Sequence, residues 1–138
     1  SYKVSNDDRK KRVNELAERF ELTDALSSPM MSYSHGMRQK LMVIAALVHN
    51  PPVWILDEPM TGLDPKSSYE LKEMMREHAK KGNAVFFSTH VLEVAEKLCD
   101  KVIIIKKGNL LYDGTLENLE SQHLNQTLEN IFLEMTEN

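Results

Sequence analysis

Apolar positions in the first 48 residues follow helical spacing. Residues 7–20 carry an apolar side chain every three or four positions, which predicts an amphipathic helix. A second helical pattern covers residues 34–48, with Ser34 at the N-cap position and a Pro-Pro pair that stops it. Residues 21–32 lack such a pattern and are expected to be irregular.

Short apolar runs alternate with further helical segments in the rest of the chain. The runs at residues 53–56 and 84–88 are nearly all apolar, which suits strands buried on both faces of a sheet. A helix is predicted between them, with Asp64 as its N-cap, Pro65 in its first turn and Gly82 after its end.

The same alternation continues to the end of the chain. Residues 91–98 are predicted to be a short helix and residues 102–105 a third strand, followed by a hairpin partner at 110–112. A closing helix is expected within residues 125–137. Strands that alternate with helices predict parallel βαβ units, so we expect an α/β fold with a mainly parallel sheet flanked by helices.

The composition of the 138-residue chain is that of an ordinary globular protein, with 41% hydrophobic and 28% charged residues. Its formal net charge of −4 gives no electrostatic reason to expect a nucleic-acid partner. The basic run at residues 9–12 is interpreted as the solvated end of the first helix, with a phosphate-binding patch as the alternative.

Cysteine content and hydropathy indicate the cellular compartment in which the protein is expected to work. Cys99 is the only cysteine, so no disulfide can form within the chain, and a reducing compartment is expected. No apolar run approaches the roughly 20 residues that span a bilayer. If the protein serves a membrane, we expect it to do so peripherally, from the cytoplasmic face.

Two adjacent carboxylates, Asp57 and Glu58, directly follow the first apolar run. Ligands of open α/β sheets bind at the carboxyl ends of the strands, so these side chains are expected to face a site. In phosphoryl-transfer enzymes one such carboxylate holds Mg²⁺, and a second orients or deprotonates the attacking water. Asp57 is therefore the candidate metal ligand and Glu58 the candidate base, with a plain solvated loop as the alternative.

Two further segments carry candidate binding groups. Ser34 and Gly36 lie at a predicted helix start, where a hydroxyl, backbone N–H groups and the helix dipole suit an anion. The alternative there is ordinary capping without a ligand. His90 follows the second apolar run and is expected at the same sheet edge as Glu58, where it could reach a phosphate or orient a carboxylate. The alternative for His90 is a purely structural role.

Taken together, these segments resemble the motifs of ABC transporter ATPases, in the order and at the spacing of that family. Residues 34–40 resemble the signature motif, 55–58 the Walker B strand, 61–64 the D-loop and 88–90 the switch-histidine loop. The resemblance extends over about residues 33–119, and residues 128–134 resemble the tails of bacterial drug- and antibiotic-type exporter ATPases. The chain is thus identified as the C-terminal portion of such an ATPase.

The resemblance implies domains and residue roles. Residues 1–48 would be part of the helical subdomain, ending in the signature helix, and residues 49–138 the C-terminal part of a RecA-like P-loop NTPase core. The implied roles are catalytic for Glu58 and His90, metal binding for Asp57, and ATP binding for Ser34, Gly36, Met37 and Asp64. This sequence departs from the common Leu-Ser-Gly-Gly-Gln form at His35, which replaces a glycine, and at Met37, which replaces the glutamine.

A phosphate-binding loop is missing, because no glycine in the chain is followed by Lys-Ser or Lys-Thr. In this family ATP lies between two head-to-tail cassettes. We therefore expect neither ATP nor Mg²⁺ to bind well to the chain alone, and no useful ATPase activity from it. The expected partners are a second ABC ATPase subunit, identical or paralogous, and transmembrane permease subunits.

Two other functions remain as alternatives. An ABC-type ATPase that acts on nucleic acid or ribosomes would use the same motifs, although the acidic composition argues against it. An α/β regulatory or dimerisation module with vestigial motifs is the other. The joint presence of Asp57, Glu58, Asp64 and His90 argues against such decay.

Overall fold

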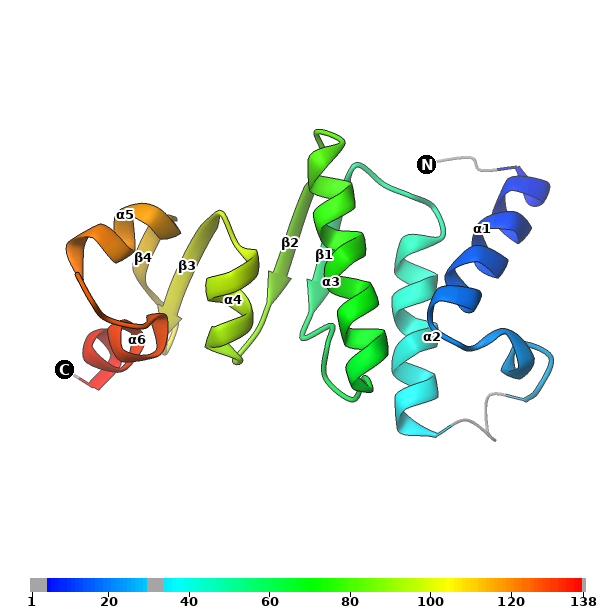
Figure 1. The fold of residues 1–138 in the computed structure, drawn as a ribbon, viewed down its shortest axis with the longest axis horizontal. Helices are drawn as coiled ribbons and strands as arrows, with labels where there is room; N and C mark the ends of the chain where they lie inside the picture. The colour runs from blue at the N-terminus through cyan, green and yellow to red at the C-terminus, as the bar shows by residue number, and fades with distance from the viewer. Residues whose placement is uncertain (1–4, 30–33, 138) are drawn as a thin grey trace. The chain divides into compact units, whose positions relative to one another are not determined.

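The computed structural model describes residues 5–29 and 34–137, and the chain divides into two units, Ser1–Ser88 and Thr89–Asn138. The first unit contains, in order, α1 (Asn6–Arg19), the 3₁₀ turn η1 (Thr23–Ala25), α2 (His35–Leu47), β1 (Val53–Asp57), α3 (Pro65–Lys80) and β2 (Ala84–Ser88) (Figure 1). These bounds confirm the predicted helices and strands of this part to within two residues. The domain boundary expected after residue 48 stays a prediction.

Each long helix of the first unit begins at a side-chain cap. Ser5, Ser34 and Asp64 accept hydrogen bonds from backbone N–H groups in the first turns of α1, α2 and α3. Such caps satisfy donors that have no partner inside the helix. The caps predicted at Ser34 and Asp64 are confirmed, and Gly82, with φ +85°, follows the end of α3 as predicted.

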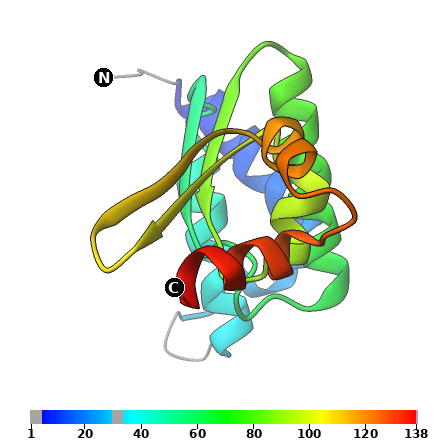
Figure 2. The ribbon, with the colours of Figure 1, turned by 90° about the vertical axis from the view of Figure 1, so that its left-hand side faces the viewer.

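β1 and β2 form a parallel pair in which Val53 lies beside Ala84 and Asp57 beside Ser88. Helix α3 runs alongside this pair (Figures 1 and 2), and the Trp54 ring stacks on His78 of α3 with 4.0 Å between centroids. The core of the unit is apolar side chains from both helical and strand elements: Leu16, Ala17, Phe20, Leu22, Val43, Ile44, Leu47, Val48, Trp54, Leu56, Leu71, Met74 and Met75.

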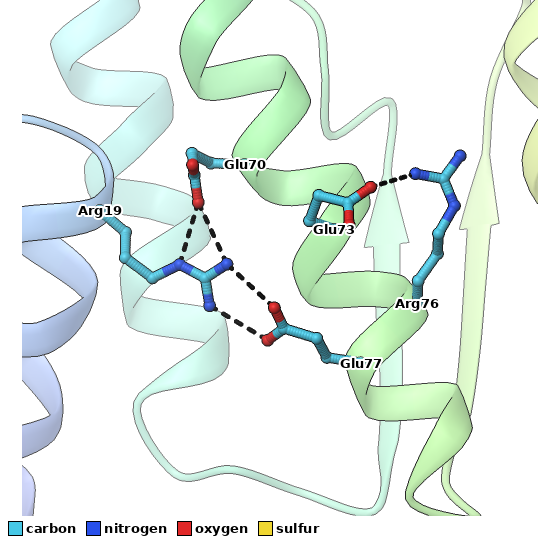
Figure 3. Close-up of polar contacts among 5 residues, drawn as sticks. All are labelled: Arg19, Glu70, Glu73, Arg76 and Glu77. Atoms are coloured by element: carbon cyan, nitrogen blue, oxygen red, sulfur yellow. Dashed lines mark hydrogen bonds and ion pairs between the residues drawn. The ribbon is translucent and has the colours of Figure 1, made fainter.

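An arginine bridge joins the end of α1 to α3. The Arg19 guanidinium contacts the Glu70 carboxylate at 3.1 Å and the Glu77 carboxylate at 3.2 Å (Figure 3). Both carboxylates belong to α3, where they lie two turns apart on the side that faces α1 (Figure 3). The bridge therefore fixes the helical start of the unit against its α/β part.

The other face of the strand pair is not buried. Val53, Ile55 and Phe86 are 50%, 76% and 58% exposed, so the expectation that both strands are buried on both faces is wrong for this chain. Successive side chains of a strand point to opposite faces, and only the face that carries Trp54 and Leu56 packs against a helix. Among the described residues of the first unit, no segment covers the face that carries Ile55.

The second unit contains α4 (Leu92–Leu98), β3 (Lys101–Lys106), β4 (Asn109–Thr115), α5 (Leu116–Gln122) and α6 (Leu128–Glu137). β3 and β4 form the predicted antiparallel hairpin (Figure 2), which turns at Lys107 and Gly108, both with positive φ. The core of the second unit consists of Ala95, Ile104, Leu116, Leu119, Leu128 and Ile131. The chain is thus mixed α/β, with a parallel strand pair flanked by helices, as predicted.

Helix α5 is not among the predicted elements. It begins at Thr115, whose hydroxyl accepts from the Asn118 N–H at 3.1 Å, and it buries Leu116 and Leu119 in the core of the second unit. The closing helix is confirmed, and the Leu128 N–H at its start donates to the Glu96 carboxylate of α4 at 3.2 Å.

Candidate functional site

The carboxyl ends of β1 and β2 place three polar residues together. Asp57 and Ser88 are direct neighbours in the parallel register, and Glu58 follows at the next position. The Ser88 hydroxyl donates to Asp57 Oδ1 and accepts from the Glu58 backbone N–H at 2.9 Å. Ser88 therefore fixes both the Asp57 carboxylate and the chain direction immediately after the strand.

Glu58 occupies a strained backbone conformation. Its φ is +44°, in the left-handed region that residues other than glycine rarely adopt. Its carbonyl accepts from the Thr61 N–H at 3.2 Å, so the chain turns sharply after β1. Such a conformation costs on the order of 1–3 kcal/mol and concentrates at functional sites, where the surrounding structure maintains it. Glu58 thus lies in a hydrogen-bonded turn, and its role as a catalytic base stays a prediction.

The donor set at this edge fits Mg²⁺. Carboxylate and hydroxyl oxygens, as provided by Asp57 and Ser88, are hard ligands of the kind that Mg²⁺ prefers. Within residues 5–29 and 34–137, no three His, Cys, Asp or Glu side chains group closely enough to hold a metal by themselves. A magnesium ion bound to nucleotide phosphates usually takes just one or two protein carboxylates, and the role of Asp57 as one of them stays a prediction.

The start of α2 has the geometry of a capped helix N-terminus. The Ser34 hydroxyl accepts from the Met37 N–H at 3.2 Å, and Gly36 lies in the first turn between them. As an acceptor in this bond, the hydroxyl keeps its own hydrogen for donation to a ligand. Tyr33, which precedes the cap, lies outside the described residues.

The loop at residues 61–64 lies directly against this helix start. A Cβ added at Gly36 would be 3.0 Å from the Gly62 carbonyl oxygen, and one added at Gly62 would be 2.9 Å from the His35 ring. Gly62 also has φ +81°, which favours glycine. Gly36 thus allows the close approach of two predicted motifs, the signature helix and the D-loop, and Gly62 is favoured by its backbone conformation.

Two side chains of α2 extend this contact. Gln39 Nε2 donates to the Pro59 carbonyl at 3.2 Å, and the Lys40 ammonium lies 2.9 Å from Asp64 Oδ1. Asp64 also accepts from the Ser67 N–H and the Ser67 hydroxyl. The bond from Lys40, followed by that from Ser67, holds the pKa of the Asp64 carboxyl well below its usual range. Asp64 is therefore an ionised cap that connects α2 to α3, and its contact with ATP stays a prediction.

Sequence reasoning assigned no role to three of these residues. Ser88, Gln39 and Lys40 lie inside the predicted motifs but were not expected to hold them together. The position of Ser88 beside Asp57 could have been inferred, since two five-residue parallel strands that end together place these residues in register. The partners of Gln39 and Lys40 are far away in sequence, and no local pattern indicates them.

His90 belongs to the second unit, in the segment between β2 and α4, and it is exposed. Beside it, the Thr89 hydroxyl accepts from the Val91 N–H at 3.0 Å, which shapes the turn into α4. The expected approach of His90 to Glu58 stays a prediction.

No helix in the described part of the chain is both long and apolar enough to span a bilayer.

Comparison with known proteins gives consistent matches. A model of the family described as ABC transporter matches residues 1–61. The ABC transporter ATP-binding protein NatA of Bacillus subtilis is 35% identical over 132 residues, 96% of this chain and 54% of NatA. The ABC-type transporter ATP-binding protein EcsA of the same organism is 36% identical over 138 residues, 99% of this chain and 56% of EcsA.

A drug-resistance protein and a solved structure are also similar. The daunorubicin resistance ATP-binding protein of Streptomyces coeruleorubidus is 37% identical over 111 residues, 80% of this chain and 35% of that protein. A solved structure described as the ATP binding subunit of an ABC transporter matches this chain with a TM-score of 0.90 and 36% identity. The match covers 98% of this chain and 57% of the chain in that structure. The chain spans about half the length of most of these relatives. In its motifs, its fold and these matches, the chain is similar to the ATP-binding proteins of ABC transporters.

Proposed function

We propose that this chain is part of a subunit that binds and hydrolyses ATP to drive transport of a substrate across a membrane. The observation that carries the proposal is the arrangement at the carboxyl ends of β1 and β2, where Ser88 holds Asp57 and the Glu58 backbone. No relative described above favours the nucleic-acid alternative, and the net charge of −4 does not suit it either.

Asp57, Glu58 and His90 would each have a different role in hydrolysis. Asp57 would hold Mg²⁺ beside the phosphates, where the ion neutralises negative charge as it develops. Glu58 would orient the attacking water or accept its proton, from a turn that the Ser88 hydroxyl fixes in place. His90 would support Glu58 or contact the phosphate, as the family resemblance implies.

The start of α2 would serve the nucleotide of a second ATPase subunit. Ser34 and Gly36 present a hydroxyl and a backbone N–H group at the positive end of a 13-residue helix, which suits a phosphate, and the Met37 N–H orients the Ser34 hydroxyl. The Lys40–Asp64 pair would hold this half-site at a fixed distance from the loop after Glu58. At the cytoplasmic face of the membrane, this subunit would bind transmembrane permease subunits, which complete the transporter. Similarity to a daunorubicin resistance protein favours an exporter.

Magnesium-dependent ATP hydrolysis by the full-length protein tests this proposal. The Asp57→Asn substitution keeps the shape of the side chain and removes its charge, so turnover is expected to fall to background. Asp113→Asn, at an exposed position of β4, is the matched control and is expected to leave turnover unchanged. Full activity in the Asp57→Asn protein, or hydrolysis without a divalent cation, would contradict the role of Asp57.

A further inference from the structure

The loop between β1 and α3 contacts the start of α2 through Gly62. Three residues of α2 lie against this glycine: His35, Gly36 and Gln39. A Cβ added at Gly62 would be 2.9 Å from His35 Cδ2 and 4.0 Å from Gln39 Cβ. In Figure 1 the loop and the start of α2 lie at the same end of the first unit, where β1 ends. The loop therefore approaches the helix at a residue that has no side chain.

The same loop carries Glu58, the candidate base. The Thr61 N–H donates to the Glu58 carbonyl at 3.2 Å, which closes a turn immediately before Gly62. Gln39 Nε2 of α2 donates to the Pro59 carbonyl at 3.2 Å. The turn is thus held on α2 at two points, by a hydrogen bond at Pro59 and by packing at Gly62.

The His35 ring supplies the packing contact. Its Cδ2 and Nε2 atoms occupy the space beside Gly62 that a side chain at that position would enter. Gly62 has φ +81°, and glycine has more accessible backbone conformations than any other residue. A ring that fills the adjacent space removes some of these conformations. His35 therefore restrains the loop at the point where its backbone is least restricted.

We propose that His35 is a positioning residue for ATP hydrolysis. Its ring holds Gly62 in place and, through the turn closed at Thr61, the backbone from which the Glu58 carboxylate extends. It acts without contact to the nucleotide or the attacking water. His35 replaces a glycine of the common signature motif, and a glycine has no ring to make this contact. The inference rests on the proposed role of Glu58.

Steady-state ATP hydrolysis by the full-length protein, with kcat and KM measured separately, tests this role. His35→Ala removes the ring and keeps a good helix former in α2. Its kcat should fall about tenfold, because small displacements of a catalytic group are costly. Its KM for ATP should change by less than about twofold, since contacts with bound ATP are kept. His49→Ala, at an exposed histidine just after α2, is the matched control and should change neither value.

A conservative variant separates packing from the chemistry of the imidazole. His35→Phe keeps a flat ring beside Gly62 and removes both nitrogens, so it should retain most of the wild-type kcat. Circular dichroism checks that each variant is folded. An equal loss of kcat in His35→Phe and His35→Ala would overturn the proposal. A raised KM with unchanged kcat in His35→Ala would also overturn it, because it would indicate direct contact with the nucleotide.

Amide hydrogen exchange gives a readout that does not depend on ATP. Exchange in residues 59–63 of the full-length protein should be faster in His35→Ala than in the wild-type protein, because the loop opens more readily without the ring. His35→Phe and His49→Ala should leave this exchange unchanged. Equal exchange in His35→Ala and the wild-type protein would show that the ring does not restrain the loop.

A double variant tests whether His35 acts through Glu58. Residues that act as a unit have non-additive effects, so His35→Ala should not slow the Glu58→Gln protein further. A further tenfold loss in the double variant would overturn the proposal. Failure of the proposed function itself gives a different result, because Glu58→Gln and Asp57→Asn would then each hydrolyse ATP at the wild-type rate.

Discussion

The Lys40 ammonium lies 2.9 Å from the carboxylate of Asp64, and this pair connects the second turn of α2 to the N-cap of α3. Lys40 is well buried, with 13% of its side chain exposed, whereas Asp64 is 43% exposed. With the Gly36–Gly62 approach and the bond from Gln39 to Pro59, the pair makes the helix start and the loop after Glu58 one connected body. The predictions for Lys40 and Asp64 depend on this connection.

Removal of the Lys40 charge should loosen the connection. Lys40→Met is expected to lower the free energy of unfolding by about 1 kcal/mol, since it leaves the Asp64 carboxylate with one fewer partner. Urea denaturation measures this loss. Lys66→Met, which breaks an exposed pair with Glu21, is the control and should cost less. An equal loss in both variants would show that the partly buried pair has no special role.

Asp64 should contribute both as a cap and as an ion-pair partner. Asp64→Asn keeps an oxygen that can accept from the Ser67 N–H, so it should lose just the charge pair. Asp64→Ala loses the cap as well and should be less stable by about a further 1 kcal/mol. Thermal denaturation of the two variants separates these contributions. Identical stability of the two would mean that the Asp64 cap contributes nothing.

The contribution of Asp64 should depend on pH. Its pKa is lower in the folded protein than in the unfolded chain, where the pKa of an aspartate is about 3.9. Its stabilising effect is therefore complete above that value and is lost as the pH falls through it toward the folded pKa. The stability difference between the wild-type protein and Asp64→Asn should narrow between pH 6 and pH 3. A stability difference that stays constant over this pH range would contradict the lowered pKa of Asp64.

Ser88 should matter for catalysis beyond its effect on stability. Ser88→Ala removes the bonds to Asp57 and to the Glu58 N–H, so turnover of the full-length protein should fall about tenfold, as expected for the loss of one bond to a charged group. Ser88→Thr keeps the hydroxyl and should restore most of the activity. Ser121→Ala, an exposed hydroxyl in α5, is the control. Wild-type turnover in Ser88→Ala would show that the hydroxyl does not position the site.

Local signals in the sequence were enough to predict most elements and their caps. Ser34 and Asp64 were expected as N-caps because a polar side chain directly precedes a helical pattern, and both act so. Helix α5 was missed because it is short and mostly polar, with Leu116 and Leu119 as its buried residues. Its signal lies in packing against the rest of the second unit, which no short stretch of sequence reveals.

Features that depend on distant contacts could not be predicted in the same way. The exposure of Ile55 and Phe86 depends on which segments cover the sheet, and an apolar run alone does not say whether both faces are covered. The Lys40–Asp64 pair likewise requires the helix and the loop to be placed first. The order and spacing of the motifs along the chain predict the motif residues, but they do not predict the contacts between distant residues that hold these motifs in place.

We propose that Glu58 orients the attacking water or accepts its proton, so its charge should matter more for ATP hydrolysis than for ATP binding. The most direct test measures ATP binding and ATP turnover in the full-length protein that carries Glu58→Gln, beside the exposed control Glu18→Gln. We predict that Glu58→Gln binds ATP as the wild-type protein does and hydrolyses it at least about a hundredfold more slowly, while the control does both normally. Turnover at the wild-type rate in Glu58→Gln would contradict the account.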